Sequence, residues 1–337
     1  MTDGAADSRD GRGAWRPEGR IAPAPINHWP PQPGAVLRWF FRFPGYLWPL
    51  NALWAAVTLV TWIWLTPALA SMQSFETWWV ALVLGRNLGL TLLLYGGLHL
   101  YFYVFARQGE ALRFNPKPFA TDSGRFLFRH QVRDNMFRTL VLGVPVFSGY
   151  EVLTYWGFAN GFLGHIEFDV GPLLFWSWCL ALLIFAPVVH SAHFYFGHRL
   201  LHVRALYRTV HALHHRNVDV GPWSGLAMHP VEHLVYFSTA VIPWLLALHP
   251  VNALFQIQFA VFNAAVAHTG FEKLKLGERL AIDAGSHFHD LHHKYFECNY
   301  GGGLVALDKL FGTFHDGSDD SQAAMRARQR AIHKTAA

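Results

Sequence analysis

The run LLFWSWCLALLIFAPVV, from Leu173 to Val189, contains no charged residue and leads into HRLLHVRALYRTVHALHH, from His198 to His215. A helix needs about 20 mainly apolar residues to span a bilayer. Three further runs approach that length: Leu47–Ala70, Leu88–Ala106 and Leu140–Trp156. With 52% apolar and only 15% charged residues, the chain of 337 residues is typical of integral membrane proteins. The sequence therefore predicts an all-α membrane bundle of about four spans.

Lysine and arginine are distributed unevenly around these runs. They gather before the first run, between the second and third, and after the fourth, whereas residues 71–78 and 157–172 contain neither. The positive-inside rule then places both termini, and the histidines after the fourth run, in the cytoplasm. We expect a bacterial inner membrane or the endoplasmic reticulum. The net charge of +5 comes with no aromatic and basic module for nucleic acid, so anionic lipid headgroups are the expected partner.

The chain divides into four expected parts. They are a disordered Pro-, Gly- and Arg-rich tail over 1–34, a transmembrane region over 35–171, a histidine-bearing part over 172–316 and a polar helical tail over 317–337. Within the third part, the apolar stretch Leu234–Ala267 is broken at Pro243 and near His249, and each half is short for a full crossing. We predict a hairpin of short spans or a re-entrant pair, because histidines on both sides must reach one face.

The histidines are spaced for metal binding. A helix places residues i, i+3 and i+4 on one face, so each cluster can direct its imidazoles toward one centre. Eight rings take part: His198, His202, His211, His214, His215, His289, His292 and His293. Packing eight imidazoles without a cation would leave repelling or unsatisfied groups. Scattered histidines such as His28, His99, His130, His165, His315 and His333 are interpreted as ordinary packing or interface residues.

The number of ligands bears on the metal. Neutral imidazole suits iron, zinc or copper, and a zinc ion takes four protein ligands, so eight histidines indicate two metal ions. Hydrolytic zinc sites add a carboxylate base, and Glu232 in HPVEH stands in a different frame from the usual HExxH motif. Two iron ions that react with dioxygen account for the nitrogen ligands better, although the ligand type alone leaves zinc open.

These segments resemble the fatty acid hydroxylase and sterol desaturase superfamily of integral membrane di-iron oxygenases. The resemblance rests on HRLLH, LYRTVHALHH, HPVEH, HTGFE and HDLHH, followed by NYG, between about Pro172 and Phe314. It implies a four-span bundle capped by a cytosolic domain that holds two metals, with 172–316 as the catalytic domain. The stretch HSAHFYFGH departs from many relatives, because Ser191 replaces an acidic residue and His190 and His193 are additional.

The resemblance also implies roles for individual residues. The implied ligands are His198, His202, His211, His214, His215, His268, His289, His292 and His293. His229 and His233 of HPVEH are either ligands or hydrogen-bond partners of ligands. Tyr195, Arg199, Tyr207, Asn299 and Tyr300 fall beside the ligands and are expected to orient them.

The activity that the resemblance implies is an oxidoreductase with two iron ions as cofactor. It would use O2 and two electrons to hydroxylate or desaturate a C–H bond of a lipid taken from the bilayer, whether a fatty acyl chain, a sterol or a polar lipid. No haem-binding HPGG motif is present, so we expect a separate electron donor, a ferredoxin or a small haem protein with an NAD(P)H reductase. Two alternatives stay open: a non-catalytic membrane metal-binding or transport protein, and a zinc-dependent lipid hydrolase.

Overall fold

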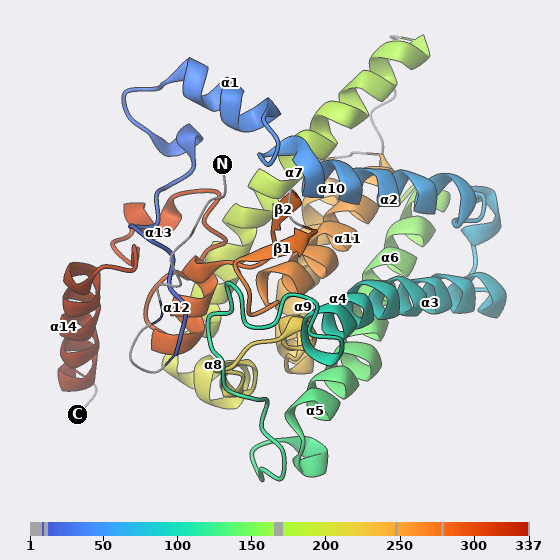
Figure 1. Cartoon of the computed structure of the whole chain (residues 1–337). Coiled ribbons are helices and arrows are strands. Elements are labelled where there is room, and N and C mark those ends of the chain that lie inside the picture. The colour runs from blue at the N-terminus through green and yellow to red at the C-terminus, as the bar shows by residue number, and fades with distance from the viewer. Residues whose placement is uncertain (1–8, 10–12, 165–170, 247–248, 278–279, 336–337) are drawn as a thin grey trace.

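The computed structural model describes residues 9, 13–164, 171–246, 249–277 and 280–335, which are mainly helical (Figure 1). The helices are α1 (Pro33–Phe41), α2 (Ala52–Trp64), α3 (Thr77–Thr91), α4 (Gly97–His99), α5 (Gln131–Phe137), α6 (Val144–Ala159), α7 (Gly171–Leu201), α8 (Arg204–Thr209), α9 (Pro230–Phe237), α10 (Val241–Leu245), α11 (Pro250–Ala267), α12 (His287–Tyr295), α13 (Leu307–Leu310) and α14 (Asp319–Thr335). Two short strands, β1 (Lys273–Leu276) and β2 (Leu280–Asp283), pair as an antiparallel hairpin. The predicted all-α membrane fold is confirmed apart from this hairpin.

Five helical segments of the described chain are long and apolar enough to cross a membrane. They are Leu47–Trp64, Thr77–Val104, Gln131–Ala159, Trp176–Leu201 and Pro250–Ala267. The second joins α3 and α4 with the turns around them, and the third joins α5 to α6. All four predicted spans are present, and the protein is an integral membrane protein. The second and third segments begin earlier than hydropathy alone indicated.

The early start of the third segment has a physical cause. Its first two turns carry polar residues, which hydropathy assigns to a loop, but the fold buries them. Gln131 Nε2 and Asn135 Nδ2 donate to Asn217 Oδ1 at 3.0 and 2.8 Å. Asp134 Oδ1 accepts from Arg138 Nε at 2.7 Å. Because these groups find partners within the protein, the helix extends two turns beyond its apolar part.

Helix α11 lies at the centre of the molecule (Figure 1). In this segment 89% of residues are buried inside the protein, against 17% of Leu47–Trp64, because α2, α6 and α7 pack around it. The predicted break near His249 is present: His249 Nδ1 accepts from Val251 N at the start of α11, and Pro250 takes the first helical position. The two halves differ, because α9 and α10 are short whereas α11 is a full 18-residue helix.

A buried polar cluster joins two of the membrane segments. Arg86 of α3 forms an ion pair with Glu151 of α6. Glu151 Oε2 accepts from Asn87 Nδ2 at 2.7 Å, and Glu151 Oε1 accepts from the Tyr155 hydroxyl at 2.6 Å. Both carboxylate oxygens are therefore satisfied by neighbouring donors. We call these four residues the Arg86–Glu151 network.

The N-terminal segment differs from the expected disordered tail of residues 1–34. Residues 1–8 and 10–12 lie outside the described part of the chain. Beyond them, the Trp15 ring packs against Phe114 with centroids 6.0 Å apart, and Ile21 N donates to the Asp316 carbonyl at 2.8 Å. Asn27 Nδ2 donates to the Leu304 carbonyl at 2.8 Å. Where it is described, this segment lies against the body of the protein because its aromatic and amide groups have partners there.

Candidate metal centre

Four separate segments bring the clustered histidines together. His198 lies in the last turn of α7, His202 directly follows this helix, and His268 directly follows α11. A 3₁₀ turn, His211–Arg216, carries the second cluster, and α12 carries the third. The Ser286 hydroxyl accepts from His289 N and so caps the start of α12.

The side chains form two groups in the described part of the chain. Within each group, one ring nitrogen per histidine lies within 4.8 Å of all the others. The five-histidine group is His198, His202, His211, His215 and His292, and the four-histidine group is His214, His268, His289 and His293. Each of the two HxxHH clusters divides between the groups, so the expectation that one cluster faces one centre is corrected. The 3₁₀ turn directs His214 away from its two neighbours, and α12 similarly separates His292 from His289 and His293.

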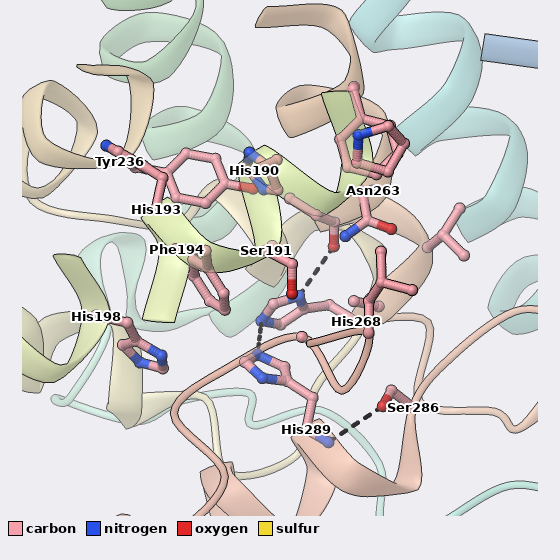
Figure 2. Close-up of a pocket in the computed structure, with 18 of the residues that line it drawn as sticks. His190, Ser191, His193, Phe194, His198, Tyr236, Asn263, His268, Ser286 and His289 are labelled. Atoms are coloured by element: carbon pink, nitrogen blue, oxygen red, sulfur yellow. Dashed lines mark hydrogen bonds between the residues drawn. The ribbon is translucent and has the colours of Figure 1, made fainter. Parts of the chain in front are cut away.

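The spacing of the ring nitrogens matches a metal coordination shell. His211 Nε2 lies 3.0 Å from the Nε2 atoms of His198 and His215. In the four-histidine group, His268 Nε2 lies 3.1 Å from His289 Nε2 (Figure 2). Nitrogens bound about 2.1 Å from one ion would lie about 3.0 Å apart in octahedral geometry and about 3.4 Å apart in tetrahedral geometry. The observed separations fit ligands around a shared ion.

Hydrogen bonds on the far side of three rings show which of their nitrogens is free to bind a metal ion. Three rings contact backbone carbonyls through Nδ1: His198 to Tyr300 at 2.7 Å, His292 to Cys298 at 2.6 Å and His268 to Ala264 at 2.9 Å. A carbonyl only accepts, so Nδ1 of a neutral ring carries the proton and Nε2 presents a lone pair. Several lone pairs directed at one point repel each other unless a cation lies between them. The residues therefore fit two metal ions.

Burial keeps these imidazoles in the form that binds metals. Desolvation lowers the pKa of His268 to about 4. It also lowers the pKa of His214, His215, His289 and His292 well below the ordinary histidine value, and their neighbouring rings add to the effect. At neutral pH the rings are uncharged, as metal ligation requires.

Glu232 is a member of the site that the sequence analysis considered only as a base in the wrong frame. Its Oε1 lies 2.8 Å from His211 Nδ1, and its side chain is buried. Desolvation raises the pKa of this carboxyl well above its ordinary value. A carboxylate paired with the far nitrogen of a ligand orients the ring and makes it a stronger donor. The HPVEH motif thus contributes its glutamate to the centre.

The two histidines of the same motif lie outside both groups. His229 Nδ1 accepts from Val231 N, which caps the start of α9. His233 Nε2 lies 3.0 Å from the Leu226 carbonyl. They stabilise the segment that carries Glu232, and neither ring is gathered with the nine others.

The loop after α12 supplies two of the orienting carbonyls. Phe296 and Asn299 have φ values of 67° and 53°, which turn the chain back toward the centre. Asparagine tolerates this left-handed region better than most residues. Asn299 Nδ2 also donates to the carbonyls of Phe288 and His315, both at 3.0 Å. These contacts hold the Cys298 and Tyr300 carbonyls against the rings.

The other residues expected to orient ligands act less directly. The Tyr300 hydroxyl donates to Glu297, so the hydrogen bond from Tyr300 to His198 comes from its carbonyl. The Tyr300 ring lies edge-on to that of His202, with centroids 4.8 Å apart. Arg199 Nη1 donates to the Tyr195 hydroxyl at 2.6 Å, and neither side chain makes a hydrogen bond to the nine rings within the described chain. The Tyr207 ring lies 5.3 Å from that of His202, centroid to centroid.

A cavity of about 390 Å³ opens beside the centre. Rings of both groups line its inner end, including His198, His211, His214, His268 and His289. Aromatic and aliphatic side chains form much of the remaining wall, among them Phe194, Met228, Val235, Tyr236 and Phe259. A mainly apolar pocket that ends at converging polar groups is typical of a binding site for an apolar ligand.

Comparisons with known proteins agree with this geometry. Residues 183–313 match the model of the fatty acid hydroxylase family, and this segment contains all nine grouped histidines and Glu232. This segment of the chain is therefore a fatty acid hydroxylase domain. The predicted resemblance to the fatty acid hydroxylase and sterol desaturase superfamily is thereby confirmed. No solved structure matches the chain.

Curated relatives of the chain include two kinds of plant enzyme. Methylsterol monooxygenase 2-2 of Arabidopsis thaliana is 32% identical over 147 residues, which cover 42% of this chain and 55% of the relative. The very-long-chain aldehyde decarbonylase GL1-11 of Oryza sativa subsp. indica is 33% identical over 150 residues, which cover 43% and 56%. Methylsterol monooxygenase 1 of Danio rerio is 27% identical over 180 residues, or 53% and 60%. The chain thus spans little more than half the length of these relatives.

Proposed function

We propose that this protein is a membrane oxygenase that holds two iron ions and uses O2 and two electrons to hydroxylate or desaturate a C–H bond of a lipid. The observation that carries the proposal is the pair of histidine groups at the inner end of a mainly apolar cavity. The superfamily and the names of the relatives, a sterol monooxygenase among them, support a lipid as the substrate.

The ligand set favours iron over zinc. The five-histidine group offers five nitrogens to one ion, one more than the four ligands that zinc takes in most protein sites. Iron accepts five or six ligands and suits imidazole. Bound iron would supply the reaction of dioxygen with an unactivated C–H bond, chemistry that no side chain performs.

The protein's own residues have three tasks. The backbone carbonyls of Ala264, Cys298 and Tyr300 hold Nδ1–H of their ligand rings, and Glu232 holds His211. The apolar cavity wall excludes water and places an alkyl chain or ring system beside the inner end. Burial in the surrounding helices keeps the imidazoles neutral.

We further propose that the centre faces the cytoplasm of a bacterial inner membrane or the endoplasmic reticulum. The support is the distribution of lysine and arginine around the spans. A cytoplasmic centre is accessible to a separate electron donor, a ferredoxin or a small haem protein with its NAD(P)H reductase. The lipid enters laterally from the bilayer.

The test combines metal analysis with lipid mass spectrometry. We expect the purified protein to contain about two iron ions per chain. We expect cells with the protein to accumulate a lipid shifted by +16 mass units (hydroxylation) or −2 (desaturation), and only when oxygen is supplied. A His214→Ala, His292→Ala double variant serves as the control, because it removes one ligand from each group.

Two alternatives predict different results. A zinc-dependent lipid hydrolase would release products without oxygen or reductant, and zinc would copurify in place of iron. A metal-binding or transport protein would hold metal without any oxygen-dependent lipid product. Either result would contradict the proposal.

A further inference from the structure

The segment before the first membrane span carries large apolar side chains that the protein does not cover. Trp29 is 89% exposed, and Leu37 and Phe41, one turn apart on α1, are 58% and 61% exposed. Phe43, which follows α1, is 50% exposed. Figure 1 shows α1 at the edge of the molecule, just before α2. Single apolar side chains are common on protein surfaces, but several large ones on one short segment mark a face that another molecule covers.

This face also carries positive charge. Arg38 and Arg42 are exposed, and each directly follows one of the two apolar residues of α1. No aspartate or glutamate occurs between Glu18 and Glu76. The two guanidinium groups therefore have no acidic neighbour within the segment, and the face combines aromatic and aliphatic side chains with uncompensated positive charge.

The other side of the segment is fixed to the protein around Tyr46. The rings of Trp39 and Phe40 pack on the Tyr46 ring, with centroids 4.9 and 5.2 Å away. The Tyr46 hydroxyl donates to the Ile184 carbonyl of α7. Trp39 and Tyr46 also line the cavity beside the metal centre. This part of the segment is consequently one wall of the cavity.

A second attachment lies nearer to the N-terminus. Asn27 Nδ2 donates to the Leu304 carbonyl at 2.8 Å, and Asn27 Oδ1 accepts from Ala306 N at 3.1 Å. Ala24 and Leu304 line the cavity as well. We call residues 24–46 the strap, because they are held at both ends and line the cavity between. The exposed apolar side chains and the two arginines form its outer face.

The strap leads directly into the membrane. The first membrane segment, Leu47–Trp64, begins at the next residue, so the strap lies at the boundary of the bilayer. Aromatic and aliphatic side chains next to arginine are typical of segments that lie between the lipid headgroups and the acyl chains. Anionic headgroups supply the negative charge that the strap lacks, and phosphate oxygens match the geometry of a guanidinium group.

A second copy of the chain fits this face less well. In a symmetric pair the same face contacts itself, so the arginines of both copies would meet without an acidic group between them. Each lipid phosphate instead brings its own negative charge to an arginine. The charge of the face and its continuity with a membrane span therefore both favour an anionic bilayer.

We propose that the outer face of the strap anchors the chain to anionic phospholipids: its apolar side chains enter the headgroup region, and Arg38 and Arg42 bind lipid phosphates. Because Trp39 and Tyr46 belong to the same strap, the anchor holds one wall of the cavity at the bilayer surface. The contact involves neither histidine group and goes beyond the proposed function.

The experiment compares labelling of the strap by an anionic and by a zwitterionic lipid. The full-length protein is placed in nanodiscs of phosphatidylcholine that contain a trace of photoreactive phosphatidylglycerol or, in a parallel sample, photoreactive phosphatidylcholine. Each probe carries a diazirine near the carboxyl end of one acyl chain. After illumination, mass spectrometry measures the label on strap peptides relative to peptides of the membrane segment Thr77–Val104. We expect phosphatidylglycerol to label the strap at least about fivefold more than phosphatidylcholine, the preference that one arginine near an anionic headgroup provides.

Two double variants separate the charge from the apolar contact. Arg38→Gln, Arg42→Gln should bring the ratio of the two lipids close to one, while most of the label remains because the apolar side chains still enter the bilayer. Leu37→Ser, Phe41→Ser should remove most of the label from both lipids. All four side chains are exposed, so these changes leave the packing of the protein intact.

The matched control is Arg326→Gln, Arg330→Gln on α14. Both arginines are exposed and are four residues apart, as Arg38 and Arg42 are, but the described part of α14 exposes no large apolar side chain. We expect this variant to keep the wild-type preference of the strap for phosphatidylglycerol.

Three results would overturn the proposal. They are equal labelling of the wild-type strap by the two lipids, a wild-type ratio that survives Arg38→Gln, Arg42→Gln, and crosslinks between strap peptides of two chains, which would show that a second copy covers the face. The measurement needs neither bound metal nor oxygen. Failure of the anchor therefore leaves the proposed oxygenase standing, and a protein without oxygen-dependent products can still show the anchor.

Discussion

The Arg86–Glu151 network and the histidine groups are both buried polar clusters in a largely apolar protein, yet they differ in completeness. In the network, Arg86, Asn87 and Tyr155 each donate to Glu151, so the charges and lone pairs are matched. In the histidine groups, ring nitrogens of neighbouring histidines lie 3.0 to 3.2 Å apart, and the carbonyls that hold Nδ1 of His198 and His268 leave a lone pair on Nε2 of these two rings. The first cluster has all of its polar groups paired within the protein and stabilises the helix packing. The second has the arrangement of metal ligands, and this difference is the reason for proposing that it binds cations.

The largest expected effect is the loss of metal and activity after substitution of a histidine in the five-histidine group. His292→Ala should lose at least one metal ion per chain and reduce oxygen-dependent activity more than a thousandfold, because it removes a ligand that contacts the rest of the five-histidine group. Metal analysis of the purified variant and lipid mass spectrometry measure the two effects. Membrane insertion should be unchanged. Retention of both ions would contradict the ligand assignment.

A substitution in the Arg86–Glu151 network should instead lower the folding stability of the protein. Glu151→Ala leaves the Arg86 charge buried without its partner, which costs about 3–5 kcal/mol of folding free energy. The denaturant midpoint of the protein in detergent measures this loss, and the metal content of the remaining folded protein should not change. An Arg86→Met, Glu151→Leu double variant should recover most of the stability, since no unpaired charge remains. Metal loss in folded Glu151→Ala protein would show that the two clusters are coupled.

A smaller effect is expected for Glu232, which contacts His211 but belongs to neither histidine group. Glu232→Gln keeps the size of the side chain but replaces the carboxyl group that contacts His211 Nδ1, and we expect metal affinity to fall by about 10–100-fold. Competition with a chelator of known affinity measures it. Tyr300→Phe is the matched control, because the carbonyl that holds His198 belongs to the backbone and survives the change.

The smallest expected effect on metal binding concerns His233, one of the two HPVEH histidines that lie outside both groups. His233→Ala removes a buried ring and its hydrogen bond to the Leu226 carbonyl, so the stability should fall by about 2–4 kcal/mol. Metal content measured as for His292→Ala should stay at the wild-type value. A loss of metal comparable to that of His292→Ala would place His233 among the ligands.

Sequence patterns predicted the features that depend on local spacing. The four apolar runs predicted spans, and the histidine spacing predicted that distant clusters meet, as His198 and His292 do. The break near His249 followed from HPVN. In each case the decisive signal lies within one helix or one turn.

Features that depend on tertiary partners were not predictable in the same way. Gln131 and Asn135 belong to a membrane segment only because Asn217, some 80 residues later, accepts from both. Glu232 meets His211 only when α9 packs beside the 3₁₀ turn. The division of each HxxHH cluster between two groups depends on backbone geometry that the spacing does not reveal.

Main-chain oxygens, instead of side chains, aim three of the ligand rings, at positions 264, 298 and 300. Every amino acid carries a backbone carbonyl, so replacements at these positions preserve the aim of the rings as long as the backbone path is kept. The geometry of the histidine groups is thereby insulated from many substitutions around them. Under the proposed function, substrate preference can change through cavity residues such as Phe259 while the histidine groups stay the same.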